Sequence, residues 1–322
     1  MLNLKNECAG AKTIAISGHV RPDGDCVGST TAMYRYLKKV FPDAQVDLYL
    51  EKPAEIFRCL ADVKDVKDET DPSLTYETVY DLFIALDCST TDRLGNAARL
   101  FDLAKKRVVI DHHISNNGLG DVWEIRPDAS STCEILYDLM EPEYLDEELA
   151  KSLYVGIIHD SGVFQYSNTG VHTLEVASKL VGYGFDFATL IDETFYEKTY
   201  LQNQIMGRAL LESILFMDGR CIVSSVDRKT MEFYGANPKD LDGIVSQLRL
   251  TKGVEVAIFM YETATQEYKV SMRSSDAVDV ASIATFFGGG GHKKAAGCTM
   301  NGSFHDVVNN LSGHIAKQLG ME

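Results

Sequence analysis

Short apolar runs alternate with amphipathic stretches through the first half of the chain, and this alternation constrains the fold more than any other feature. The centre of each run is apolar on both faces, as strands buried inside a parallel sheet require. Stretches of helical periodicity separate the runs, which is typical of βαβ connections. We expect strands at residues 13–17, 46–50, 81–87 and 107–111. The pattern predicts an α/β domain with a doubly wound, mainly parallel sheet.

Helices dominate the sequence after the fourth predicted strand. A Ser/Thr pair precedes one helical stretch, and Asp-Glu-Glu opens the next, where acidic residues favour the positive end of the helix dipole. We expect helices at residues 27–40, 131–140, 146–159 and 171–183. The first domain is therefore predicted to end near residue 185.

The remaining residues predict a second, smaller α/β domain. Strands return at 221–226, 254–261 and 267–273, and we expect them to form a mixed or antiparallel sheet with helices between the strands. A chain of 322 residues is long enough for two domains with separate cores. The predicted organisation is a domain at 1–185, a helical connector at 186–216 and a domain at 217–322.

The charge of the chain indicates which partners it can bind, and its cysteines indicate the redox compartment. The chain has 31 basic and 47 acidic residues, a net charge of −16, and the first 212 residues hold 20 of the basic and 35 of the acidic ones. Such a surface repels phosphate backbones, so long duplex nucleic acid is a disfavoured partner, whereas short anionic substrates are compatible with it. Seven cysteines without a C-x-x-C pair favour reduced thiols. With no signal-peptide pattern or membrane span, we expect a cytoplasmic protein that does not bind membranes.

Acidic and histidine residues follow three of the predicted strands. His19, Asp23 and Asp25 fall in the loop after the first strand, Asp87 ends the strand at 81–87, and the run 111–113 (Asp-His-His) ends the next. Ligands of open α/β sheets bind beyond the carboxyl ends of the strands, where all of these residues are predicted to lie. Turn formation and helix capping explain the first loop equally well when it is considered alone. The convergence of three strand ends favours a functional site.

A helix end adds a further carboxylate, Asp160. A negative charge at a helix C-terminus opposes the helix dipole, and a cation would compensate it. Four carboxylates and two imidazoles suit Mn²⁺ or Mg²⁺ better than structural zinc. Two cations roughly 3.5 to 4 Å apart would neutralise the carboxylates and activate water for the hydrolysis of a phosphate ester. The candidate ligands are His19, Asp23, Asp25, Asp87, His112 and Asp160.

A glycine run marks the second domain, in the segment FFGGGGHKKAAG at residues 286–297. Four consecutive glycines are usually a flexible joint. Here His292 and two lysines follow, and a helix or turn entering Ala295 would direct backbone N–H groups and cationic side chains at an anion. The run matches neither the dinucleotide-binding nor the P-loop pattern. We therefore expect an anion-binding lip.

Together these motifs resemble those of the DHH phosphoesterases, a family named for the run at 111–113, with their C-terminal DHHA-type domain. The segments HVRPDGD, ALD, IDHH, GIIHDSGVFQYSNT and GGGGHKKAAG occur in the order typical of the family and span nearly the whole chain. Within the family, the length and the last motif look most like those of bacterial enzymes that degrade very short RNAs and also dephosphorylate phosphoadenosine phosphate.

The resemblance implies a role for each candidate residue. His19 and Asp23 would bind one manganese ion, a second ion would be bound by Asp25, His112 and Asp160, and Asp87 would bridge the two. The catalytic residues implied are Asp87, Asp111, His112 and His113, of which His113 would touch the substrate phosphate. The substrate's phosphate or backbone would be gripped in the second domain by Arg273, Gly289, Gly290, Gly291 and His292.

The function implied is a two-metal phosphodiesterase that hydrolyses short oligoribonucleotides and dinucleotides to mononucleotides, and also acts on 3′,5′-bisphosphate nucleotides. A pyrophosphatase or exopolyphosphatase, and a nucleotide-binding regulator without turnover, are the alternatives that stay open. Mg²⁺ or Co²⁺ in place of manganese and assembly as a homodimer are further possibilities that stay open. One departure from the family is His159, where threonine is usual. A histidine at a helix end is ordinarily solvated or hydrogen-bonded, and we expect the same of His159.

Overall fold

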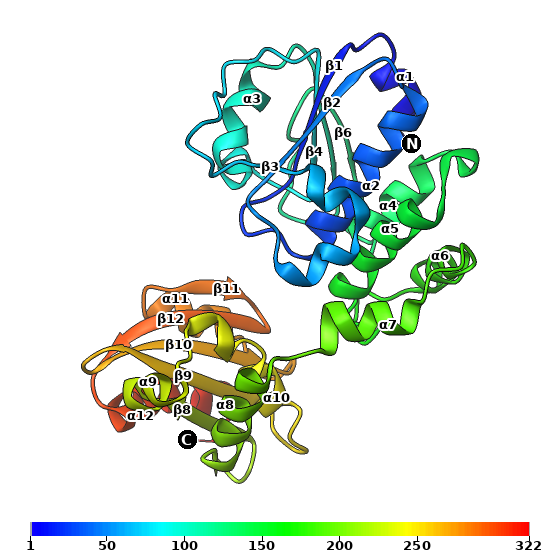
Figure 1. Ribbon diagram of the computed structural model, residues 1–322. Coiled ribbons are helices and arrows are strands. Elements are labelled where there is room, and N and C mark those ends of the chain that lie inside the picture. The colour runs from blue at the N-terminus through cyan, green and yellow to red at the C-terminus, as the bar shows by residue number, and fades with distance from the viewer. Residues whose placement is uncertain (1, 322) are drawn as a thin grey trace. The chain divides into compact units, whose positions relative to one another are not determined.

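The computed structural model describes residues 2–321, which form two compact units that divide between Glu197 and Lys198 (Figure 1). Each unit has its own sheet and its own hydrophobic cores. The division between the units falls inside the segment predicted as a helical connector. None of the helices in residues 2–321 has both the length and the apolar composition needed to cross a membrane.

The first unit contains a sheet, here called sheet A, in which every neighbouring pair of strands is parallel, as the apolar runs predict. Its strand order is β3-β2-β1-β4-β5-β6. The order reverses between β1 and β4, so the carboxyl ends of these two strands lie at the switch point where ligands of open α/β sheets bind. The strands are β1 (Thr13–Ser17), β2 (Gln45–Leu50), β3 (Lys67–Asp68), β4 (Leu82–Leu86), β5 (Arg107–Asp111) and β6 (Val122–Ile125).

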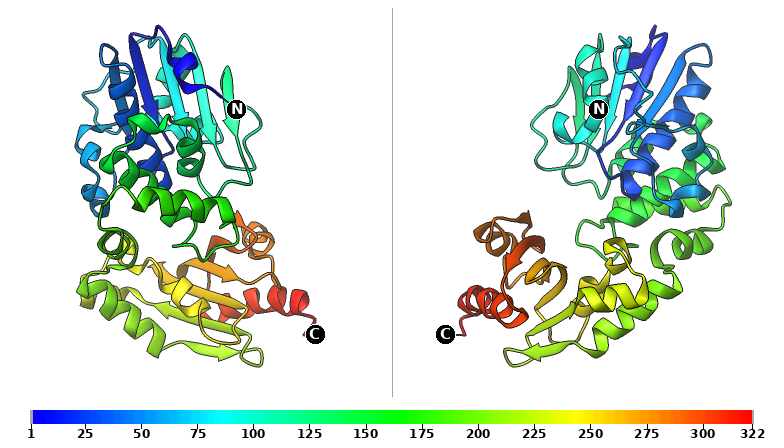
Figure 2. Two further views of the ribbon diagram at one scale, coloured as in Figure 1. Left: turned by 90° about the vertical axis from the view of Figure 1, so that its right-hand side faces the viewer. Right: turned by 60° about the vertical axis from the view of Figure 1, so that its left-hand side comes forward.

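Helices cover both faces of sheet A, which confirms the doubly wound architecture (Figures 1 and 2). Ile14 and Ile16 of β1 point into one core, and Ala15 points into the core on the other side, as the pleat of a strand requires. The first core is covered by α1 (Leu4–Cys8), α2 (Gly24–Val40), α4 (Thr132–Leu139), α5 (Glu147–Asp160) and α6 (Val171–Val181). The second is covered by α3 (Ala98–Leu103) and the preceding 3-10 turns (Thr91–Ala97).

The first unit differs from the prediction mainly at short elements. The two edge strands β3 and β6 are short and only partly buried, so they lack the apolar run that marks the central strands. Short 3-10 helices (Glu55–Cys59, Ala61–Asp65 and Pro142–Tyr144) were also not predicted. Helix α2 begins three residues before the predicted start, because the Asp23 side chain accepts hydrogen bonds from the backbone N–H groups of Asp25 and Cys26. Asp25 therefore lies in the first helical turn and not in the loop.

The segment 186–216 is helical except at its end. It forms α7 (Phe187–Ile191), a π-helical turn (Asp192–Tyr196) and α8 (Tyr200–Leu211). Its last three residues are strand β7 (Ile214–Phe216), so the helical prediction is wrong there. The run is too short to show a strand period, and tertiary pairing with β8 decides its conformation.

The second unit contains a mixed sheet, sheet B, in the order β11-β12-β10-β9-β8-β7. Only the pair β8–β9 is parallel among the pairs described, so the sheet is the mixed one of the two predicted alternatives. Helices pack on both faces. The remaining elements are β8 (Cys221–Val226), α9 (Arg228–Tyr234), a 3-10 helix (Pro238–Leu241), α10 (Ile244–Arg249), β9 (Val256–Ala264), β10 (Glu267–Ser274), α11 (Val280–Phe286), β11 (Gly290–His292), β12 (Ala295–Asn301) and α12 (Phe304–Leu319).

The glycine run forms neither a flexible joint nor a helix start. It leads into β11, which pairs antiparallel with β12 across a turn at Lys293 and Lys294. Of the predicted helix or turn before Ala295, the turn is correct and the helix is wrong. Gly291 has a φ of +144°, and a Cβ atom there would lie 2.5 Å from the carbonyl oxygen of Ala295. The glycines thus let β11 lie close against its neighbour.

A buried carboxyl group, Glu69, supports the loop next to the first motif. Its side chain is 3% exposed and accepts a hydrogen bond from the backbone N–H of Ala97, and it lies under Gly95. Gly95 in turn lies against Val20, the neighbour of His19. Burial raises the pKa of Glu69 from 4.5 to about 7. Its ionised form is therefore disfavoured in the folded protein.

We expect Glu69→Gln to stabilise the protein at pH 8 but not at pH 5. The folded-state pKa is raised, so the stability that protonated Glu69 provides is present below pH 4.5 and is lost as the pH rises through about 7. Glutamine stays neutral and keeps an oxygen for Ala97, so the unfolding midpoint at pH 8 should rise by about 2 to 5 °C. Circular dichroism melts at both pH values check this, with the exposed Glu143→Gln as the control. A variant that is less stable than the wild type at pH 8 would contradict the assignment.

Candidate active site

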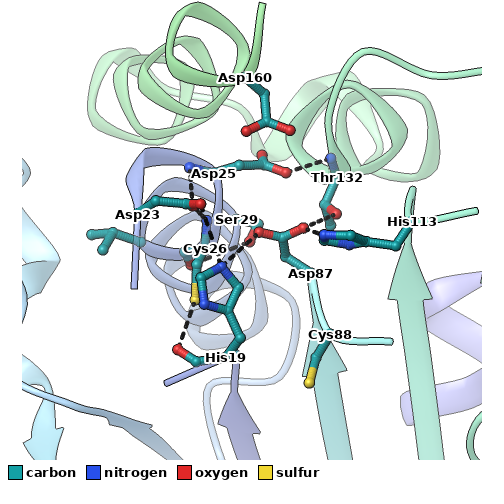
Figure 3. A network of polar contacts seen from close by, with 12 residues as sticks. His19, Asp23, Asp25, Cys26, Ser29, Asp87, Cys88, His113, Thr132 and Asp160 are labelled. Carbon is teal, nitrogen blue, oxygen red and sulfur yellow. Dashed lines mark hydrogen bonds and ion pairs between the residues drawn. The ribbon is translucent and has the colours of Figure 1, made fainter. Parts of the chain in front are cut away.

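The loop after β1 brings His19 and Asp23 to Asp87 at the end of β4 (Figure 3). His19 Nε2 lies 3.5 Å from Asp23 Oδ2 and 3.5 Å from Asp87 Oδ2. The other ring nitrogen, Nδ1, lies 2.9 Å from the carbonyl oxygen of Val20, to which it donates. This hydrogen bond fixes the ring so that Nε2 faces the two carboxylates. Asp23 therefore both caps α2 and faces the site, so the capping and the functional interpretations of this motif are compatible.

Asp25 is fully buried and is held by the start of α4. Its two carboxylate oxygens accept hydrogen bonds from the backbone N–H groups of Thr132 (2.7 Å) and Cys133 (3.0 Å). These are N–H groups of the first helical turn, which lack partners inside the helix, and the helix dipole favours a negative charge there. The packing of α4 against α2 thus fixes the orientation of Asp25.

Asp87 lies at the centre of the site and is 2% exposed. Its φ is +54°, a left-handed conformation that is costly for a residue other than glycine and that is found most often at functional sites. The backbone N–H of Asp87 donates to the carbonyl of Ile110, which anchors the residue to β5. The hydroxyl of Thr132 donates to Asp87 Oδ1 at 3.2 Å.

His112 and Asp160 complete a second group around Asp25. His112 Nε2 lies 3.0 Å from Asp160 Oδ2, 3.9 Å from Asp25 Oδ2 and 3.5 Å from Asp87 Oδ1. The two oxygens of Asp87 thus face different histidines, Oδ2 facing His19 and Oδ1 facing His112. The structure brings all six predicted ligands together: His19, Asp23 and Asp87 form a first group of three, and Asp25, His112 and Asp160 form a second. The two groups meet where His112 faces Asp87, and Asp87 also forms a group with His112 and His113.

His113 is oriented by two residues behind it. Its Nδ1 donates to Asp111 Oδ1 at 2.7 Å, and the amide of Asn116 donates to Asp111 Oδ2 at 2.8 Å. Asp111 is fully buried, whereas His113 is partly exposed. Its Nδ1 lies 3.5 Å from Asp87 Oδ1, so the ring borders the two groups of three. The hydrogen bond to Asp111, the largest influence, raises the pKa of His113 and favours its cationic form.

Carboxylates and imidazoles in this site shift one another's pKa values. Burial and then the charges of Asp87 and Asp160 raise the pKa of Asp25 well above its usual range. Burial lowers the pKa of His19, but its contacts with Asp23 and Asp87 outweigh burial and raise that pKa to about 10. The site therefore concentrates negative charge that calls for cations.

Divalent cations fit this set of side chains. In both groups of three, the candidate ligand atoms lie within 4.8 Å of one another. The ligand atoms are carboxylate oxygens and imidazole nitrogens without a thiolate, a combination that Mn²⁺ and Mg²⁺ accept. The four carboxylates formally balance two divalent charges, and two of them are too buried for water to solvate well.

The comparison with known proteins agrees with this arrangement. The model of the DHH family's N-terminal domain matches residues 13–157, and the DHHA1 domain model matches residues 218–319. A Thermus thermophilus protein named bifunctional oligoribonuclease and PAP phosphatase NrnA is 31% identical over 293 residues, which cover 90% of this chain and 84% of that protein. The chain belongs to the DHH family. It is a hydrolase that acts on phosphate ester bonds, and the resemblance seen in the motifs is confirmed.

Solved structures share the DHH fold with this chain. The crystal structure of an exopolyphosphatase-related protein from Bacteroides fragilis matches with a TM-score of 0.88 at 23% identity, covering 98% of this chain and 95% of that one. The crystal structure of exonuclease RecJ bound to manganese matches with a TM-score of 0.52 at 14% identity, covering 100% of this chain and 95% of that one. At these identities the likeness concerns the fold alone.

In the DHHA1 domain, the predicted substrate residues lie at one end of sheet B. Arg273 of β10 is opposite Ala295 of β12, and Ala295 is opposite His292 of β11. Residues opposite each other on neighbouring strands point to the same face, so Arg273 and His292 flank Ala295 about 10 Å apart. Lys294, the last residue of the turn, forms an ion pair with Asp276 at 2.8 Å. Gly289, Gly290 and Gly291 lead into this row along the edge of the sheet.

For His159 the sequence predicts a solvated or hydrogen-bonded ring, and of these alternatives the solvated ring is not observed, whereas a hydrogen bond with the Thr194 backbone contributes to its pKa. Its ring packs between Phe57 (5.2 Å between ring centroids) and Phe195 (5.5 Å), and a Cβ atom at Gly24 would overlap it. Its Nε2 is buried without a hydrogen-bond partner among the described residues. Burial lowers the pKa of His159 to about 4, so the ring is neutral and acts as a packing group.

Sequence reasoning missed two polar residues of the site. Thr132 donates to Asp87 and Asn116 holds Asp111, but both come from stretches rich in Ser, Thr or Asn that are typical of caps and turns. Only their positions in the sequence indicate a role in the site, since Asn116 follows the Asp-His-His run and Thr132 starts the next helix.

Proposed function

We propose that this chain is a phosphodiesterase that uses two divalent cations, Mn²⁺ being the best candidate, to hydrolyse very short oligoribonucleotides to mononucleotides and to remove phosphate from phosphoadenosine phosphate. The two groups of three that meet at Asp87 support the chemistry. The name of the relative that is 31% identical over 90% of this chain supports the substrates.

His19 and Asp23 would hold one cation, Asp25, His112 and Asp160 the other, and Asp87 both. Two cations in such a site supply Lewis-acid stabilisation of a phosphoryl group and lower the pKa of bound water. The hydrogen bond from His19 to the Val20 carbonyl, and those from the backbone N–H groups at the start of α4 to Asp25, hold these ligands in place before substrate arrives.

His113 would bind a phosphate oxygen of the substrate. Asp111 and Asn116 fix its Nδ1 side, so its Nε2–H is the group that can donate to a ligand. The raised pKa favours the cationic form of the ring, and a charge-assisted hydrogen bond to phosphate is stronger than a neutral one. His113 would thus orient the phosphate and stabilise charge that develops on it.

The DHHA1 domain would bind the far phosphate. Arg273 offers a guanidinium, which matches a phosphate in geometry, and His292 lies in the same row of sheet B. Strand β11 is the edge of the sheet, and an edge strand has unpaired backbone N–H groups on its outer side. A short substrate needs only these contacts and the cations, which agrees with the acidic charge of the chain.

A parallel assay with Mn²⁺ tests this function. The substrates are linear diadenylate, a 24-nucleotide RNA, phosphoadenosine phosphate and inorganic pyrophosphate. We expect rapid release of AMP from the dinucleotide and of phosphate from phosphoadenosine phosphate, with kcat/KM for the 24-mer at least about 100-fold lower, because a long chain needs a basic track that this surface lacks. Turnover of pyrophosphate alone would overturn the proposed substrates and support the pyrophosphatase alternative.

A further inference from the structure

The first unit has a cavity that lies outside the group of candidate ligands. It has a volume of about 640 Å³ and is formed by the segment between Lys52 and Asp68, which connects β2 to β3. We call it the 52–68 pocket. Pro53, Leu60 and Val63 contribute apolar surface to it, and Lys52, Arg58 and Lys64 line it with exposed cationic groups.

The charge of the 52–68 pocket is opposite to that of the domain around it. Three basic and two acidic side chains line the pocket, a net charge of +1, whereas residues 1–212 carry 20 basic and 35 acidic residues. Arg58 pairs with Glu55, and Asp68 accepts hydrogen bonds from the backbone N–H and the hydroxyl of Thr70. Within residues 2–321, neither Lys52 nor Lys64 forms an ion pair, so their exposed ammonium groups are available to an anion.

The same segment lies next to the active site. The carboxylate of Glu51, the residue before Lys52, accepts a hydrogen bond of 2.6 Å from the backbone N–H of Arg21, in the loop between His19 and Asp23. Phe57 lies in the turn of 3-10 helix that carries Arg58, and its ring packs on His159 beside Asp160. The pocket and the candidate ligands therefore share the carboxyl edge of sheet A.

Apolar surface combined with cations suits one class of ligand, a nucleoside phosphate. A base needs apolar contact over its faces, and a phosphate needs lysine or arginine groups at the opening. A cavity of this size lies within the usual range for small-molecule sites, roughly 300 to 1,000 Å³. A purely anionic ligand such as pyrophosphate would leave the apolar surface uncovered.

We propose that the 52–68 pocket binds a nucleoside phosphate, with the phosphate at Lys52 and Lys64 and the base on the apolar surface. Resting on the proposed function, its ligand is the nucleotide of an oligoribonucleotide that extends beyond the ester being cleaved. A free mononucleotide has the same chemistry and is the second source. The pocket would then favour substrates of three or four nucleotides over dinucleotides.

The test compares Lys52→Ala/Lys64→Ala with Lys12→Ala/Lys105→Ala, a control that removes the same charge at the amino end of sheet A. Ala54→Trp, at an exposed position of the pocket, fills the cavity without a change of charge. Activity is measured as kcat/KM for a tetranucleotide and a dinucleotide of adenylate. Loss of two phosphate contacts should lower kcat/KM for the tetranucleotide about tenfold and for the dinucleotide less than about twofold, with the control unchanged.

Calorimetric titration with AMP in the presence of EDTA identifies the source of the ligand. If AMP binds the wild type but neither pocket variant, the pocket binds free mononucleotide. If the variants change only the turnover of the tetranucleotide, the pocket binds the substrate chain. The proposal is wrong if both pocket variants behave like the control in both measurements. It is also wrong if kcat/KM falls equally for the tetranucleotide and the dinucleotide while AMP binding is unchanged. A wild type that cleaves no oligonucleotide contradicts the proposed function, and the AMP titration then decides the pocket by itself.

Discussion

Replacing Asp87 by alanine is expected to lower kcat for phosphate ester hydrolysis by about 10³-fold or more, because each of its oxygens would serve a different one of the two proposed cation sites. Asp87 is the residue at which the two groups of three meet, with Oδ2 facing His19 and Oδ1 facing His112. Loss of this carboxylate removes a ligand from both sites at once, whereas a change at Asp23 or Asp160 would affect one. Initial rates on linear diadenylate with saturating Mn²⁺ measure the effect.

The fold should survive the loss of Asp87. Removal of its charge relieves repulsion on Asp25 but also ends the contacts with His112 and His19, which outweigh burial and lower the pKa of Asp87, and alanine at a φ of +54° is strained. Asp87→Asn avoids the strain, since asparagine tolerates the left-handed region, and tests the charge alone. Asp47→Asn is the control, a buried aspartate of β2 that pairs with Lys67 and should keep at least half the activity. Near wild-type turnover by either Asp87 variant would refute the two-cation site.

The candidate ligands can be predicted from the sequence because two simple rules apply to them together. Apolar runs identify the buried strands, and parallel strands place their carboxyl ends along one edge. Asp87, directly after β4, and His112, directly after β5, are therefore close in space although 25 positions of the chain separate them. Asp160 is predicted through the unfavourable electrostatics of a carboxylate at a helix end, and its partner is His112.

The contacts that hold these ligands depend on tertiary packing and have no local sequence pattern. Asp25 is oriented by the start of α4, more than 100 residues away along the chain, and nothing in either segment predicts that pairing. His159 packs on Phe57 because a 3-10 helix, which shows no apolar period, brings that ring over α5. From the sequence alone, the glycines before β11 resemble a flexible joint, and only the structure shows that they allow β11 to lie close to β12.

Removing divalent cations is expected to abolish hydrolysis and to lower the unfolding temperature. With EDTA the rate should fall about 10³-fold or more, and Mn²⁺ or Mg²⁺ in excess of the chelator should restore it. Without cations, Asp25, Asp87 and Asp160 lie close together in a buried site, where burial and then the charges of the neighbouring carboxylates raise the pKa of Asp25 and Asp160. A cation that binds only the folded chain therefore stabilises it, by several degrees at concentrations well above Kd.

The dependence of that stabilisation on Asp87 distinguishes the proposed site from general effects of salt. Mn²⁺ added to the wild type in low-salt buffer should raise the unfolding midpoint, while the same ionic strength of NaCl should not, since screening alone places no charge between the buried carboxylates. Asp87→Asn should show a much smaller rise, because the first group of three loses a ligand charge and His112 of the second group loses the carboxylate that it faces. Asp47→Asn should respond like the wild type. Full activity in EDTA, or an equal rise of the unfolding midpoint in the Asp87→Asn variant, would contradict the proposed cation site. The buried carboxylates would then be neutralised by protons and histidines alone.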